Sequence, residues 1–421
     1  MVISLIRRLR QFSRRIYVRV TLYAVLNVVA LVVATLLGPI IPASLGRLIG
    51  ADAVDTILQV IATSMLAVVT FSLTIMSSAF ARAAGQWTPR SHMLMREDTV
   101  THSVLATFLG AYLYALIAII LRAADLFGER EMVVVFGMTM VVIASIVWSI
   151  IRWISHLEGL GSLQVTARRL EVRAVRAVAQ AVEQPAQSAN RLTDPAGTIP
   201  RDAVPVHAGD AGYVQQIFEA ELQDLAAAQE ARIYVARPAG AYVQRGDVLA
   251  LVADTTPDEE MVEAVRAAIP VSDVRSFDHD PVFCVTVLSE IATRALSPGV
   301  NDPGTAIDIL HRLSHVIGDA GPSKEPDTPE HDRVWIEPLM PEELFYASFD
   351  PIARCANEAV EVHLALQSSL ADIVRIGHPA VAAAAREAAL RCLARANGAL
   401  ENDGDRERLA AAMSIREAAA S

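Results

Sequence analysis

The sequence contains very little lysine and cysteine. Lys324 is the only lysine, so almost every positive charge is carried by arginine. The three cysteines, Cys284, Cys355 and Cys392, lie far apart and have neither metal-binding nor thioredoxin-type spacing. This distribution favours buried, reduced thiols in a cytosolic domain over a metal centre or a redox pair.

The motifs of common enzyme classes are also missing. There is no glycine-rich phosphate loop, no nucleophile elbow and no paired-carboxylate signature. The formal net charge of −11 argues against general nucleic-acid binding by the soluble part. We therefore expect no catalytic residue, no metal, no cofactor and no nucleic-acid partner.

Long apolar segments are abundant in the first 155 residues. Four of them reach the roughly 20 residues that a helix needs to cross a bilayer. They are Val20–Ile41, Ile57–Ala81, Ser103–Leu121 and Met132–Trp153. The apolar part of the first exceeds the roughly 7–15 residues of a signal peptide. We predict a four-helix transmembrane domain over residues 20–154, preceded by a basic cytosolic segment, residues 1–19.

Arginines are concentrated in alternate connections between these segments. The basic residues that we expect at the membrane interface are Arg7, Arg8, Arg14, Arg15, Arg82 and Arg90. Loops rich in lysine and arginine stay in the cytosol, so this pattern predicts a multi-pass protein with both termini in the cytoplasm. The N-terminal arginines should also attract anionic lipids of the cytosolic face.

Small and hydroxylated side chains recur along one face of the second segment. Steps of four and three residues connect them, which places them on one helical stripe. This hydroxyl stripe comprises Thr56, Val60, Thr63, Ala67, Thr70, Thr74, Ser77, Ala81, Ala84 and Thr88. It has two interpretations: a helix–helix packing seam, or the wall of a pore in which hydroxyls replace part of an ion's water shell.

The centres of the four segments contain no aspartate, glutamate or lysine. Coupled transporters rely on such groups for proton relay and counter-ion binding. Passive conduction, or no transport at all, fits the sequence better than coupled transport. A conduit built from this stripe needs several subunits to complete its wall, so we expect a homo-oligomer.

Three regions follow the membrane domain. Residues 155–201 read as a membrane-exit helix over residues 155–182 and a linker, Glu183–Arg201, "EQPAQSANRLTDPAGTIPR". Residues 202–256 alternate in strand fashion and contain "GAYVQRGDVL", which resembles the barrel-sandwich of lipoyl and biotinyl carrier domains. That region has no lysine to modify, so only a small barrel-like shape is expected. Residues 257–421 are mostly helical, beginning with a helix at about Asp258–Ala268.

Two helices of this last region meet at the sequence "SPGVNDPGTA", residues 297–306. Ser297, Pro298 and Gly299 end the first helix. Asp302 before Pro303 is the pattern of a helix N-cap followed by proline at the first helical position. The corner has this structural explanation, and it could also face a partner or bind an anion at the new helix start.

Two signatures in the chain resemble those of a family of predicted bacterial membrane proteins, domain of unknown function 2254. The first is "TFSLTIMSSAFARAAGQWTPR". The second is "RALSPG-x-NDP-x-TA", matched here by Arg294, Ala295, Leu296, Ser297, Pro298, Gly299, Asn301, Asp302, Pro303, Thr305 and Ala306. Upstream of the corner the resemblance implies "QD-x-x-FG", whereas this chain has His279 and Cys284 at the Gln and Gly positions.

Histidines provide the remaining candidates for chemistry. His311 and His315 lie four residues apart with Asp308 on nearly the same face, which could start a metal site but more often forms a polar patch. His279 lies between two aspartates and could act with Asp280 as an acid or base. An exposed loop histidine is the simpler interpretation.

Together these features predict an α-helical membrane protein with an α+β cytosolic domain, located in the bacterial inner membrane. The leading functional hypothesis is a passive channel for small inorganic ions, with Thr63, Thr70, Thr74 and Ser77 along its path. The alternative is a membrane-anchored scaffold or signalling protein without transport activity.

Overall fold

A computed structural model describes residues 51–86, 88–90, 99–124, 131–157, 159, 162–322 and 328–420, together with the isolated positions 25, 29, 32 and 33. The chain divides into two compact units, Met1–Val165 and Thr166–Ser421. The first contains the membrane helices and the second an α+β region.

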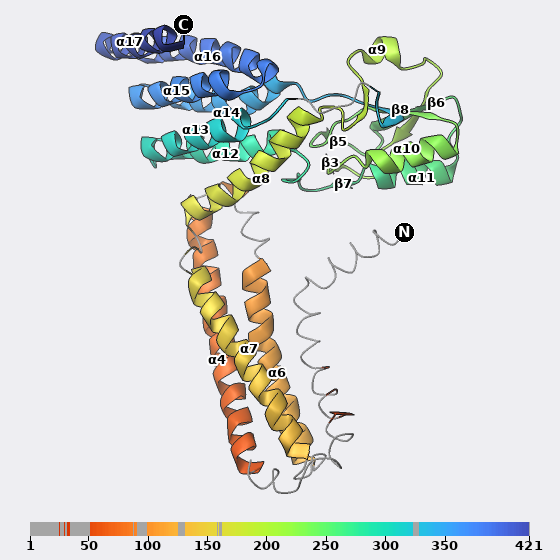
Figure 1. Ribbon diagram of the computed structural model, residues 1–421, viewed down its shortest axis with the longest axis vertical. Coiled ribbons are helices and arrows are strands. Elements are labelled where there is room, and N and C mark those ends of the chain that lie inside the picture. The colour runs from red at the N-terminus through yellow and green to blue at the C-terminus, as the bar shows by residue number, and fades with distance from the viewer. Residues whose placement is uncertain are drawn as a thin grey trace. The chain divides into compact units, whose positions relative to one another are not determined.

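Three helices of the first unit are long and apolar enough to span a bilayer. They are α4 (Ala51–Gln86), α6 (Thr99–Ala123) and α7 (Glu131–Leu157), and Figure 1 shows them side by side. Their apolar parts, Ala53–Ala81, Val100–Ala123 and Met132–Leu157, correspond to the second, third and fourth predicted spans. Of the predicted first span, Val20–Ile41, all but residues 25, 29, 32 and 33 lie outside the described residues, so the part of the chain that the structure describes shows three of the four predicted spans.

Small residues of α6 bring these helices close together. Ala111, Ala115 and Ala118 are fully or almost fully buried, and α6 contacts both α4 and α7. Small side chains allow the close backbone approach by which helices associate in lipid. The Tyr114 hydroxyl lies 3.1 Å from the hydroxyl of Thr139 on α7, so a buried polar contact joins α6 to α7.

The predicted exit helix over residues 155–182 is in fact two elements. α7 ends at Leu157, and a separate helix, α8 (Leu163–Glu183), begins the second unit. One side of α8 is buried, including Leu170, Ala174 and Val178. Gly159 between them forms a turn, which fits its low helix propensity.

The predicted linker, residues 183–201, supplies an edge of a β-sheet. This five-stranded sheet has the order β1-β8-β4-β6-β2, in which β8 is parallel to both β1 and β4 and the other pairs are antiparallel. Its strands are β1 (Ala189–Arg191), β2 (Val204–His207), β4 (Arg232–Val235), β6 (Val248–Ala253) and β8 (His331–Ile336). A short helix, α9 (Pro195–Thr198), follows β1.

A second sheet has three short strands in the order β5-β3-β7. They are β3 (Gly212–Val214), β5 (Tyr242–Val243) and β7 (Val271–Ser272). The predicted small barrel over residues 202–256 was wrong in form. The described strands make two open sheets with no closed barrel, and the five-stranded sheet takes β1 and β8 from outside that range. β4 pairs with β8, which lies far along the chain, so this edge of the sheet is covered without the closure that a barrel would need.

Two helices, α10 (Glu219–Ala228) and α11 (Glu259–Ala268), contact each other and the five-stranded sheet (Figure 1). Leu222, Ile233, Leu249 and Val265 contribute to the shared hydrophobic core. Asp258 caps α11 by accepting a hydrogen bond of 2.8 Å from the Met261 amide. The predicted helix near 258–268 is confirmed.

The remaining described helices stack in two layers (Figure 1). They are α12 (Pro281–Ala295), α13 (Pro303–Gly318), α14 (Pro341–Cys355), α15 (Val360–Ile376), α16 (Pro379–Ala399) and α17 (Asp403–Ala420). α12, α14 and α16 make one layer, and α13, α15 and α17 make the other. Ser289 of α12 donates to the Ser348 carbonyl of α14, a buried bond of 2.6 Å within the first layer.

Candidate functional site

The hydroxyl stripe lies on the exposed side of α4. Thr63, Thr70, Thr74 and Ser77 are all exposed, as is Val60 within the same stripe. Thr70 donates to the Ala67 carbonyl at 2.9 Å, and Thr74 donates to the Thr70 carbonyl at 3.0 Å. Thr63 donates likewise to the Gln59 carbonyl at 2.9 Å. These three hydroxyls therefore donate their hydrogen bonds to carbonyls of their own helix, which leaves their oxygens able to act only as acceptors.

A different face of α4 packs against the other membrane helices. Leu58, Ile61 and Met65 are buried in the core that α4 shares with α6 and α7. The stripe is therefore not the seam between α4 and either of these helices. It also ends earlier than predicted, since α4 stops at Gln86 and Thr88 is buried.

Most of the predicted interface arginines cannot be placed. Arg7, Arg8, Arg14 and Arg15 lie outside the described residues, as does the side chain of Arg82. Arg90 is exposed.

The corner between α12 and α13 has the predicted geometry. α12 ends at Ala295 with Leu296 as its cap, and Ser297 donates to the Arg294 carbonyl at 2.6 Å. Asn301 has a φ of +50°, the left-handed conformation that asparagine tolerates well. The Ser297, Pro298 and Gly299 segment thus ends one helix, and Asn301 turns the chain into the next.

Asp302 is the N-cap of α13, and Pro303 takes the first helical position. The carboxylate accepts from the Thr305 amide at 3.0 Å and from the Thr305 hydroxyl at 2.5 Å. The Thr305 side-chain bond is the main reason that the pKa of Asp302 is lowered. Since Asp302 already accepts the amide that an anion would need, the corner serves as a structural joint.

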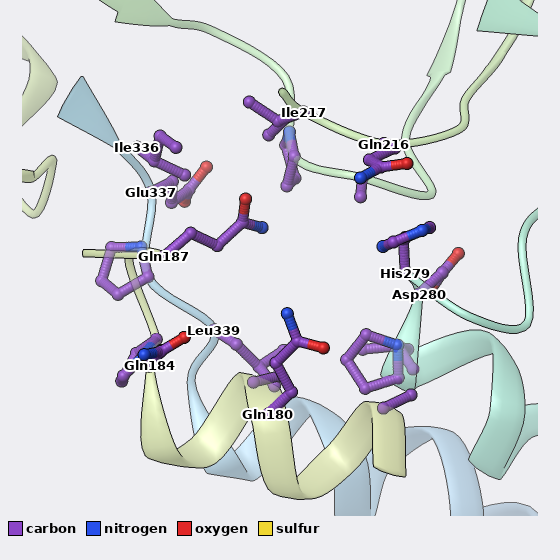
Figure 2. A pocket seen from close by; sticks show the side chains of 18 of the residues that line it. Gln180, Gln184, Gln187, Gln216, Ile217, His279, Asp280, Ile336, Glu337 and Leu339 are labelled. Carbon is purple, nitrogen blue, oxygen red and sulfur yellow. The ribbon is translucent and has the colours of Figure 1, made fainter. Parts of the chain in front are cut away.

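A cavity of about 200 Å³ lies in the second unit, and no residue of the corner lines it (Figure 2). Its wall comes from α8, from the segment after β3, from the turn between β4 and β5, from the start of α12 and from the connection between β8 and α14. Four glutamines contribute to the wall, so we call it the glutamine pocket: Gln180, Gln184, Gln187 and Gln216. In Figure 2 the amides of Gln180 and Gln187 point into the open space.

One side of the pocket is held by a buried ion pair. Asp280, 1% exposed, accepts bonds of 2.7 and 2.9 Å from the Arg275 guanidinium and one of 2.9 Å from the Phe283 amide. Burial raises the pKa of Asp280, and the bonds from Arg275 oppose that rise. A carboxylate with three such partners caps α12 and is poorly placed to act as a base.

The turn between β4 and β5 closes over this ion pair at Gly240. Its φ is +87°, and a Cβ there would lie 2.1 Å from Asp280 Oδ2. Glycine is therefore required for both reasons, conformation and space. Gly240 is the first residue of the "GAYVQRGDVL" sequence, which resembled a carrier motif. In this fold that glycine packs against Asp280 in the pocket wall.

The opposite side of the pocket contains a strained segment. Gln187 and Ser188 have φ values of +55° and +59°, and neither is glycine. Left-handed conformations of such residues are costly and persist where the surroundings enforce them. Two backbone hydrogen bonds hold the segment. The backbone N–H of Gln187 donates to the backbone carbonyl of Gln184 at 3.0 Å, and the backbone N–H of His331 donates to the backbone carbonyl of Ser188 at 3.1 Å.

The comparisons with known proteins agree with the membrane helices. The sequence model of the family described as "Predicted membrane protein (DUF2254)" matches residues 13–372. The chain belongs to the DUF2254 family. It is therefore a membrane protein of a family whose description states no activity.

Two relatives of this DUF2254 protein are uncharacterized proteins of Mycobacterium bovis and Mycobacterium tuberculosis. Each is 26% identical over 295 residues, which cover 67% of this chain and 55% of the relative. The chain thus spans about half the length of the curated relatives that it matches. No solved structure matches it.

The histidine candidates of this DUF2254 protein separate in the fold. His279 is exposed and lines the glutamine pocket, next to the paired Asp280. His311 and His315 lie on α13 away from the pocket. Among the described residues, no group of histidine, cysteine or acidic side chains is arranged to hold a metal ion.

Of these α13 residues, His315 instead lies near a buried acid of α8, Glu171. Glu171 accepts a bond of 2.5 Å from Arg312 and one of 3.2 Å from Arg168, and His315 lies 3.8 Å away. Arg312 also contacts Asp308 at 2.8 Å. Asp308 and His315 thus belong to an ionic network that joins α8 to α13.

Sequence reasoning did not identify the four glutamines, which have no common motif or spacing. A partial signal was present in "VAQAVEQPAQSAN", where three glutamines surround a helix end and a proline. The fourth, Gln216, reaches the pocket only because β3 pairs with β5 and β7.

Proposed function

We propose that this protein is a passive, oligomeric, cation-conducting channel, in which the hydroxyl stripe of α4 faces the conduction path. The observation that supports this is the outward, acceptor-only character of the stripe. Thr63, Thr70 and Thr74 are exposed, and their hydroxyl groups donate hydrogen bonds to carbonyls of α4. Oxygen lone pairs are the groups that replace water around a cation, whereas anions need donors.

Several copies are needed for such a path, because the three membrane helices that the structure describes in one chain present the stripe on one side only. We infer that α4 faces a shared axis, while α7 faces lipid through exposed apolar residues such as Val141, Trp148 and Ile151. Both termini are then cytosolic, as the arginine distribution indicates. The second unit, on the same side, would assemble or gate the channel.

Reconstitution with site-directed thiols tests this proposal. In a background with Cys355→Ser, the Thr74→Cys protein in planar bilayers should conduct cations. A positively charged, water-soluble thiol reagent should then block most of its current, because the new thiol lies in the water-filled path.

The matched control is Leu73→Cys, since Leu73 is also exposed on α4 but neighbours the stripe rather than belonging to it. Its current should survive the same reagent. Absence of any conductance, together with loss of oligomers on Thr74→Leu, would instead support the membrane-anchored scaffold. In that case the stripe would be a packing seam between copies.

A further inference from the structure

The glutamine pocket has a charge that restricts what it can hold. Asp278, Glu219 and Glu337 contribute to its wall, and among its described wall residues there is no lysine or arginine. Asp280 is already neutralised by Arg275. The remaining carboxylates repel phosphates and carboxylates and attract cations.

The amides add hydrogen-bonding capacity at the same place. Each glutamine provides a carbonyl oxygen with two lone pairs as well as an NH2 group. Gln180 and Gln187 point into the space from two sides in Figure 2. Carbonyl oxygens can accept from the N–H groups of an ammonium or guanidinium ion, which replaces the water lost on entry.

Between these polar groups the wall is apolar. Ile217 and Ile336 line it and are each 2% exposed, and Leu339, on the connection to α14, is a half-buried lining residue. Such side chains offer nothing to a charged group but pack well against methylene groups. The wall of the pocket therefore combines acidic and amide side chains with apolar side chains.

We propose that the glutamine pocket is a binding site for a small alkyl amine or guanidine, an organic cation whose charged nitrogens are joined by methylene groups. The carboxylates and glutamine oxygens hold the nitrogens, and Ile217, Ile336 and Leu339 contact the methylenes. The volume of about 200 Å³ suits a molecule smaller than a typical drug.

The pocket is held open before any ligand arrives. Gln187 is fixed in its left-handed conformation on one side, and the Asp280–Arg275 pair under Gly240 fixes the other. A preformed site loses little conformational entropy on binding. The site does not depend on conduction by the membrane unit, so it stands whether or not the protein is a channel.

The test is equilibrium binding to the full chain in non-ionic detergent, measured calorimetrically with agmatine and spermidine. At least one of the two should bind, and its affinity should fall as salt is added. Glu337→Gln removes one wall charge and should weaken binding about five- to tenfold. Gln180→Arg places a cation in the space and should weaken it by about a hundredfold.

The control is Glu387→Gln, which changes the net charge equally but lies on an exposed part of α16 outside the pocket. It should bind like the unaltered protein. Equal weakening by Glu337→Gln and Glu387→Gln would show mere attraction of polyamines to an acidic protein and would overturn the proposal. Failure of both amines to bind, or tighter binding of adenosine monophosphate, would overturn it as well. Unchanged melting temperatures establish that each variant is folded.

Discussion

At the residue scale, burial decides the chemistry of this protein's titratable groups. Cys284 and Cys392 are buried, and burial is the main reason that their thiol pKa values are raised, in Cys392 to about 12. Cys355 is half-buried. The predicted burial of the thiols is therefore confirmed for two positions, and the third is more accessible.

His363 should make the stability of the second unit sensitive to mild acid. It is 1% exposed, lies 2.9 Å from the Asn357 carbonyl and has a lowered pKa, chiefly because burial disfavours its charged form. The nearby Glu361 opposes this shift. The unfolded chain therefore binds the proton more readily, and stability should be lost as pH falls below the ordinary value of 6.5.

Melting curves between pH 8 and 5 test this expectation. His363→Gln keeps a donor for Asn357 and should reduce the loss of melting temperature in acid. His311→Gln, at an exposed position of α13, should leave it unchanged. If both variants lose stability in acid as the unaltered protein does, other groups cause the effect.

At the element scale, an aspartate followed by proline begins several helices. Asp194, Asp280 and Asp302 each cap a helix whose first residue is proline. The Asp350–Pro351 pair is an exception, because it lies inside α14. Asp350 there contacts Arg391 of α16 at 3.1 Å, and this tertiary contact helps keep the interrupted helix in place.

The cap of α13 should be measurable by mutation. Asp302→Ala removes both bonds to Thr305 and should lower the free energy of unfolding by about 1 kcal/mol. Asp302→Asn retains an acceptor and should lose less. Denaturant unfolding measures both, with Asp319→Ala at the opposite end of α13 as control. A loss as large in the control would show that the cap is not the cause.

The local patterns that predicted elements correctly have local physical causes. Asp258 and Asp302 are caps because a side-chain oxygen can reach an amide three residues on, whatever surrounds it. By contrast, β1 pairs with β8 across about 140 residues, a partnership with no local signal. The linker interpretation of residues 183–201 failed for that reason.

At the scale of the whole molecule, all three cysteines lie in the second unit, and Cys355 is the accessible one. The proposed orientation places that unit in the cytosol. A membrane-impermeant thiol reagent should therefore not label intact cells, but should label Cys355 in inverted membrane vesicles. Cys355→Ser should abolish this labelling. Modification in intact cells would reverse the orientation.

The amino-acid sequence alone determined that the chain enters a membrane, which helices start at Asp258 and Asp302, and which family it resembles. Those features depend on hydrophobicity summed over about 20 residues and on bonds between near neighbours. Only the tertiary structure decided that the hydroxyl stripe lies on the exposed side of α4. It alone assembled four glutamines from distant segments into one pocket, because packing between elements has no counterpart in local sequence.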